Sequence, residues 1–154
     1  MSGNGIPDWG IGAAIPSRDE IILLLDEGAM SGKALELLAH ELAHIFLHKK
    51  TGDVVIPRWF DEGFAQWCSG PMKFEQSSRL SRAFIFGNTI PLATLNEVNG
   101  WNRESAELAY AESRAAFDML LERVPESTPI YLFERIKEAG DFEVGFRDAM
   151  GITV

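Results

Sequence analysis

Apolar residues recur at steps of three and four along most of the chain, a periodicity typical of amphipathic α-helices. The predicted helices cover residues 32–50, 57–68, 72–86, 104–124, 129–139 and 142–150. The apolar positions of the first helix share one face and are Leu35, Leu38, Leu42, Ile45 and Phe46. Most of the chain is therefore expected to be helical.

Two short apolar segments before the first helix have the character of strands instead. Residues 11–15 are small and apolar, and residues 20–25 are apolar and β-branched near their start, so both are predicted as strands of a hairpin that turns at 16–19. The expected fold class is α+β, with a small N-terminal β-sheet and a mainly helical C-terminal half. Residues 1–154 are assigned to a single domain, because this length forms one core comfortably and two poorly.

Composition narrows the class of protein further. The apolar fraction of 46% excludes a disordered chain, and the net charge of -9 argues against nucleic acid or an anionic membrane as partner. The longest apolar run, residues 21–25, is too short to cross a bilayer, and residues 1–16 lack the basic start of a signal peptide. The single cysteine, Cys68, permits no internal disulfide. We expect a monomer with neither a nucleic-acid partner nor a membrane segment, and the sequence predicts no compartment.

The first predicted helix carries a pattern with chemical meaning, His-Glu-x-x-His, at His40, Glu41 and His44. Four residues turn an α-helix by about 400°, so the two histidines point almost the same way, one turn apart. Two imidazoles so placed can take neighbouring corners of a tetrahedral zinc ion. Glu41 lies beside them and can take a proton from a zinc-bound water without being a ligand itself. The alternative is a solvated polar face on which the histidines pair with acids.

A third ligand is needed, and His48 does not qualify. It lies about 12 Å from His40 along the helix axis, at roughly 1.5 Å per residue. One zinc ion with bonds of about 2 Å cannot hold both rings. His48 is therefore expected at the surface, or as a residue that supports the site from near the helix end.

The second predicted helix offers two acids in an aromatic setting. Its apolar stripe at i, i+4 and i+7 is formed by Phe60, Phe64 and Trp67, which we expect in the core. Asp61 and Glu62 are neighbours of these aromatic residues in the sequence, and a buried carboxylate needs a partner such as a metal. Gly63 lacks a side chain and would let two helices approach closely. The residues alone favour neither acid, and both could instead form an exposed flank.

Residues 40–44 (HELAH) and 59–65 (WFDEGFA) together resemble the gluzincin metallopeptidases, which include thermolysin and the aminopeptidase N-like enzymes. The chain is more particularly similar to the short bacterial peptidase MA-like, or minigluzincin-type, domains. The resemblance extends to residues 9–16, 109–113 and 140–151. It implies a zincin-like fold around an active-site helix, and one zinc cofactor held by His40, His44 and Glu62.

The same resemblance favours Tyr110 over Tyr131 as a catalytic residue. A phenol hydroxyl can donate a hydrogen bond to the oxyanion that forms during peptide hydrolysis. The alternative is a place on a half-buried helix face with Ala106 and Phe117. Asp61 and Gln66 are candidates for holding a zinc-bound histidine by a hydrogen bond, as metal-ligating histidines usually require.

The predicted function is a zinc-dependent peptidase that hydrolyses peptide bonds of a peptide or protein substrate. A zinc-activated water attacks, and Glu41 acts as general base and then carries the proton to the leaving amine. An extended substrate could pair with the edge of the first strand, where Gly12, Ala13 and Ala14 are small enough to let it approach. The alternative is a catalytically latent or inactive zinc-bearing protein-interaction domain of the same fold.

Overall fold

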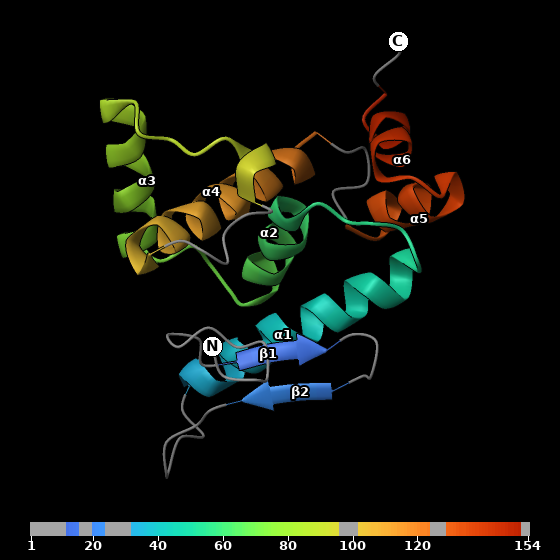
Figure 1. The fold of residues 1–154 in the computed structure, drawn as a ribbon, viewed down its shortest axis with the longest axis horizontal. Helices are drawn as coiled ribbons and strands as arrows, with labels where there is room; N and C mark the ends of the chain where they lie inside the picture. Colours follow the sequence, from blue (N-terminus) through green and yellow to red (C-terminus); the bar gives the residue numbers. More distant parts are fainter. Residues whose placement is uncertain (1–11, 16–19, 24–31, 96–101, 124–128, 152–154) are drawn as a thin grey trace.

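The computed structural model describes residues 12–15, 20–23, 32–95, 102–123 and 129–151 (Figure 1). Along the chain these residues form β1 (Gly12–Ile15), β2 (Glu20–Leu23), α1 (Gly32–Thr51), α2 (Arg58–Cys68), α3 (Phe74–Phe86), α4 (Arg103–Leu121), α5 (Pro129–Ala139) and α6 (Phe142–Ala149). All the predicted helices are present, and their bounds differ from the predicted ones by at most three residues. Within the described ranges, no helix combines the length and apolar character needed to cross a membrane.

The predicted fold class, α+β with a small N-terminal β-sheet, is wrong, because the described structure is mainly α-helical. Its β structure is limited to β1 and β2, which pair antiparallel with Gly12 opposite Leu23. Two strands of four residues cannot bury a face of their own, so they form no separate layer. They lie beside α1 instead (Figure 1). The predicted turn at 16–19 and the outer ends of both predicted strands lie outside the described residues.

The core forms where α2 lies between α1 and α4 (Figure 1). Phe60 and Phe64 of α2 are buried, as predicted. The ring of Phe60 lies edge-on to one ring from each of three other helices, with centroids 5.3, 6.1 and 5.1 Å away: Phe117 of α4, Phe133 of α5 and Phe142 of α6. This edge-to-face arrangement is favourable for aromatic rings. Trp67, the third residue of the predicted stripe, lies half exposed at the edge of this core.

Only part of the apolar face predicted for α1 joins the core: Ile45 is buried, and the ring of Phe46 contacts Phe64 and Phe133. Leu35, Leu42 and Phe46 are 57%, 50% and 41% exposed, whereas Ala43 and Leu47 are buried in the cluster shared with α2. Apolar residues occupy most of the circumference of α1, so periodicity alone does not single out one face. Ala43 is small, and it lets α2 come close to the side of α1 that carries the histidines.

The contact between α2 and α4 depends on Gly63. A Cβ atom added there would lie 2.5 Å from the carbonyl oxygen of Ser113 and 2.9 Å from Cβ of Phe117. Both atoms belong to the body of α4, so neither can move aside easily. Any side chain at this position would therefore separate the two helices and displace the neighbouring Glu62.

We predict that Gly63→Ala lowers the free energy of unfolding by about 1–3 kcal/mol, the usual cost of overpacking. The melting temperature should fall by several degrees, because about 1 kcal/mol corresponds to roughly 2–4 °C in a domain of this size. Gly32→Ala is the matched control, since Gly32 lies at the exposed start of α1 with nothing within 4 Å of an added Cβ. Equal melting temperatures for the two variants would contradict the close contact with α4.

Candidate metal centre

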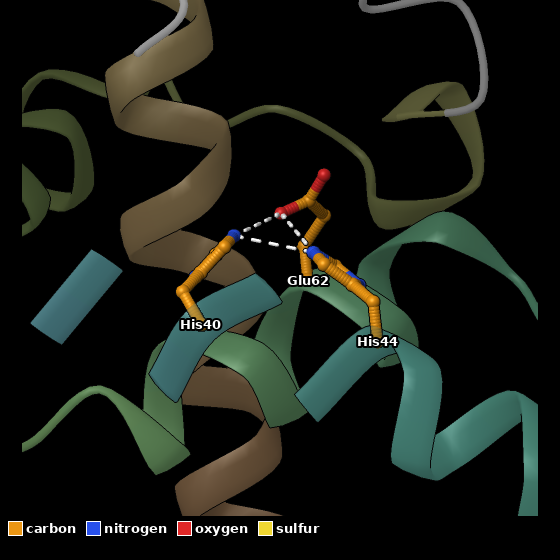
Figure 2. Close-up of side chains that lie close together, drawn as sticks. All are labelled: His40, His44 and Glu62. Carbon is orange, nitrogen blue, oxygen red and sulfur yellow. Dashed lines mark hydrogen bonds and ion pairs between the residues drawn. The ribbon is translucent and has the colours of Figure 1, made fainter. Parts of the chain in front are cut away.

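Three side chains from two helices converge at one point, as Figure 2 shows: His40 and His44 of α1, and Glu62 of α2. Nε2 of His40 lies 3.2 Å from Nε2 of His44 and 3.5 Å from Oε2 of Glu62. Nε2 of His44 lies 3.9 Å from the same oxygen. A tetrahedral zinc ion with bonds of about 2.0–2.1 Å holds its ligand atoms about 3.3–3.4 Å apart. Two of the three separations, 3.2 and 3.5 Å, are close to this spacing, and the third, 3.9 Å, is longer.

The sequence builds this convergence through helix geometry. His40 and His44 are one turn apart on α1, and their rings meet edge-on with centroids 4.8 Å apart. Pro57 precedes α2 and fixes where it begins, which suits a residue that has no N–H to donate. Glu62 lies two residues from both Phe60 and Phe64, about 200° around α2. The aromatic side of α2 therefore enters the core while Glu62 faces α1.

Asp61 performs a different task from its neighbour Glu62. Its Oδ1 accepts a hydrogen bond of 2.6 Å from Nδ1 of His44, and its Oδ2 lies 3.2 Å from Nε2 of His48. The two acids, which the residues alone could not separate, thus face different atoms. Asp61 holds the ring of His44, and Glu62 faces the two Nε2 atoms.

The contact between Asp61 and His44 shifts the pKa of both groups in opposite directions. Burial disfavours the imidazolium of His44, but the hydrogen bond and charge of Asp61, with the charges of Glu62 and Glu41, outweigh burial and raise its pKa to about 9. Burial also disfavours the charged form of Asp61, but its bonds to His44 and His48 outweigh this and hold its pKa well below the usual value. Without a metal, the two groups form an ion pair at neutral pH.

Two further contacts differ from what the sequence predicted. Oγ of Ser69 lies 3.4 Å from Nδ1 of His40, a contact that the sequence analysis missed. Ser69 follows Glu62 by seven residues, two full turns of α2, and this spacing could have indicated that both share a face. The amide oxygen of Gln66 accepts a hydrogen bond from Gln76 of α3 instead, so the predicted support of a histidine by Gln66 gains nothing from the structure.

The remaining charged and polar groups of the site surround Glu62. Glu41 is 5% exposed, and its charge acts on both His44 and Tyr110. Nε of Arg58 lies 3.6 Å from Oε1 of Glu62, and the Arg58 side chain also hydrogen bonds with the hydroxyl of Tyr110. Burial, followed by the charge of Glu62, raises the pKa of Tyr110 to about 12, against the smaller opposite effect of Arg58. Tyr110 is therefore a protonated donor at neutral pH.

Comparison with known families identifies the fold. The sequence model described as "Peptidase MA superfamily" matches residues 6–154. The chain belongs to the peptidase MA superfamily. The predicted resemblance to gluzincin-type, peptidase MA-like domains is thus confirmed. No curated protein and no solved structure matches the chain.

The peptidase MA superfamily has a metallopeptidase-like fold, so the His-His-Glu cluster is the candidate metal site of this chain. The cluster lies between α1 and the helix α2 that follows it. The backbone of β1, with Gly12, Ala13 and Ala14, pairs with β2 and lies against α1. The strand predicted to receive substrate thus contacts the helix that carries both histidines.

The opposite pKa shifts of His44 and Asp61 predict how the stability of the metal-free protein depends on pH. The raised pKa of His44 contributes stability that is complete below about pH 6.5 and is lost as the pH rises through about 9. The lowered pKa of Asp61 contributes stability that is present above about pH 4 and is lost as the pH falls further. The pair should therefore stabilise the chelator-treated protein most between about pH 4 and 6.5.

The measurement is the melting temperature of the chelator-treated protein at about pH 6 and about pH 9. The wild type should lose more stability over this range than Asp61→Asn, which has no carboxylate to hold the His44 proton. Asp53→Asn, in the exposed turn after α1, is the control and should behave as the wild type. Equal losses in the wild type and Asp61→Asn would contradict the ion pair.

Proposed function

We propose that the protein is a zinc-dependent peptidase of gluzincin type, in which His40, His44 and Glu62 hold the zinc ion. The observation that carries this proposal is the spacing of their three ligand atoms, 3.2–3.9 Å from one another. Two imidazoles and one carboxylate form a donor set typical of catalytic zinc with an open fourth position, and not of calcium or magnesium, which prefer oxygen ligands. When bound, zinc supplies Lewis-acid chemistry, which polarises a substrate oxygen and makes water a stronger nucleophile at neutral pH.

Glu41 is proposed as the general base. It follows the first ligand on α1, it is almost completely buried, and its charge acts on His44. Its carboxylate takes the proton of the attacking water and then gives it to the amine that leaves. A site with a purely structural metal would have no use for a buried carboxylate beside its ligands, so Glu41 favours catalysis over the alternative of an inactive zinc-bearing interaction domain.

Tyr110 is proposed as the donor to the oxyanion. Its pKa of about 12 keeps the hydroxyl protonated, and the charge of Glu62, a candidate ligand, contributes to raising that pKa. As the substrate carbonyl becomes tetrahedral, its oxygen gains charge, and a hydrogen bond from the phenol stabilises that charge. Arg58, which contacts both Tyr110 and Glu62, keeps the phenol near the ligand.

The substrate is proposed to be a peptide or protein segment that binds in extended form along β1. Its backbone would pair with the small residues Gly12, Ala13 and Ala14. The orientation of β1 along α1 supports this, because a strand added there would lie beside the helix that carries the histidines. A monomeric state remains a prediction.

Glu41→Gln tests the proposed mechanism directly, because it keeps the shape of the side chain and removes the base. We expect the variant to retain one equivalent of zinc while its turnover of a peptide library falls by about 10²–10⁴-fold. Glu36→Gln, an exposed position on the same helix, should keep both zinc and turnover. Glu62→Ala should lose both.

Three results would count against the proposal in different ways. Near-normal turnover of zinc-loaded Glu41→Gln would overturn the role of Glu41. Full zinc retention by Glu62→Ala would overturn the ligand assignment. A wild-type protein that holds zinc but hydrolyses no peptide would favour the latent or inactive domain instead.

Tyr110→Phe removes only the hydroxyl and keeps the ring in the helix face. We expect kcat to fall by about 10²–10³-fold with little change in KM, because the hydrogen bond forms mainly in the transition state. Tyr131→Phe is the matched control, since Tyr131 packs against the aromatic core. A lower melting temperature with normal kcat in Tyr110→Phe would assign Tyr110 a structural role only.

A further inference from the structure

The hydroxyl of Ser69 has one proton, and the structure shows where this proton goes. Oγ of Ser69 donates a hydrogen bond of 2.7 Å to the carbonyl oxygen of Ala65. A carbonyl oxygen can only accept, so the single proton of the hydroxyl is used in this bond. Toward Nδ1 of His40, 3.4 Å away, the Ser69 oxygen can therefore only accept.

This constraint favours one tautomer of His40. If the Ser69 oxygen accepts, then Nδ1 of His40 carries the ring proton, and the lone pair of the neutral ring is on Nε2. Nε2 is the atom that faces Nε2 of His44 and Oε2 of Glu62. The hydroxyl thus prepares His40 for a metal at Nε2, as the carboxylate of Asp61 prepares His44. Unlike Asp61, it adds no charge to the site.

A buried arginine holds the backbone on both sides of Ser69. Nη1 of Arg114, on α4, donates to the carbonyl oxygens of Gln66 and Gly70 at 2.6 and 2.7 Å. These carbonyls lie at the carboxyl end of α2, where they lack helical partners and where a positive charge is favourable. Nε of Arg114 donates to Asp118 at 2.8 Å, which fixes the plane of the guanidinium. The last turn of α2, including Ser69, is therefore fastened to α4.

We propose that Ser69 sets the tautomer and orientation of His40, and that Arg114 is a positioning residue that acts on the metal centre through Ser69. This inference rests on the proposed zinc site and adds to it how the first histidine is prepared. The chain of contacts runs from Arg114 through the carbonyls that flank Ser69, and then through the Ser69 hydroxyl to the His40 ring.

The direct test is the tautomer of His40 in the metal-free protein, measured by the ¹⁵N chemical shifts of its ring nitrogens at about pH 10.5. This is above the pKa of about 9 of His44, so Nε2 of His44 no longer carries a proton that would by itself hold the His40 proton at Nδ1. In the wild type, Nδ1 should carry the proton. In Ser69→Ala, the proton should move wholly or partly to Nε2, and Ser69→Thr, which keeps the hydroxyl, should restore it to Nδ1. An unchanged Nδ1–H tautomer in Ser69→Ala would overturn the inference.

Zinc affinity, measured by competition with a chelator, provides the second readout. Ser69→Ala should weaken zinc binding by about 10–100-fold, the usual effect of removing a partner of a ligating histidine. Ser81→Ala is the matched control, because the Ser81 hydroxyl makes the same kind of bond to a carbonyl four residues earlier, on the exposed side of α3. Ser81→Ala should bind zinc as the wild type does.

Arg114→Lys tests the positioning role, since a lysine keeps the charge but cannot hold both carbonyls and Asp118 in one plane. Folded Arg114→Lys should lose zinc affinity. In the double variant, adding Arg114→Lys to Ser69→Ala should cause little further loss of affinity, because both residues act through one contact. Asp118→Asn keeps the bonds to the carbonyls and serves as a milder variant if Arg114→Lys does not fold. It should lose less affinity than Ser69→Ala. Additive losses in the double variant would overturn the role of Arg114.

The two proposals fail in different ways. A wild-type protein that binds no zinc would overturn the proposed function, while the tautomer of His40 would still decide the role of Ser69. A wild type that binds zinc, with Ser69→Ala binding it equally well, would overturn the inference about Ser69 and leave the proposed function intact.

Discussion

At Gly63, α2 approaches α4 so closely that a single added carbon would lie 2.5 Å from the backbone of α4. The candidate metal centre depends on this contact, because α2 carries Asp61 and Glu62 beside Gly63, and Ser69 follows at its end. The aromatic side of α2 is fixed by Phe60 in the core, and its last turn is fixed by Arg114 of α4. With α2 held at both places, its opposite side presents two carboxylates and a hydroxyl to α1.

The two histidines of the candidate centre contact partners of different charge. Asp61 binds Nδ1 of His44 at 2.6 Å and raises its pKa, whereas the neutral hydroxyl of Ser69 faces Nδ1 of His40. Both arrangements leave Nε2 as the atom directed at the shared point. His48 extends the same row by one turn and contacts the second oxygen of Asp61. Of the three histidines on α1, His40 and His44 are the ligand candidates. The third, His48, contacts Asp61, which is the partner of His44.

Much of this could be predicted from the sequence, because the relevant signals are local. Helix periodicity gave the helices, the i, i+4 spacing paired His40 with His44, and the missing side chain of Gly63 indicated a close helix contact. The choice between Asp61 and Glu62 could not be made locally, since it depends on how α2 is rotated against α1. The role of Ser69 and Arg114 depends on contacts between residues 29 and 44–48 positions apart, which no local pattern encodes. The α+β prediction is wrong because two strands of four residues form no sheet layer, and the hairpin packs against α1 instead.

The zinc X-ray absorption spectrum of the zinc-loaded protein tests the central claim most directly. It reports the kind, number and distance of the atoms around the ion. Ligation by His40, His44 and Glu62 predicts one equivalent of zinc with two imidazole nitrogens and at least one oxygen at about 2.0–2.2 Å, and no sulfur. A sulfur atom at about 2.3 Å, which would implicate Cys68, or a spectrum with fewer than two imidazoles would contradict the account.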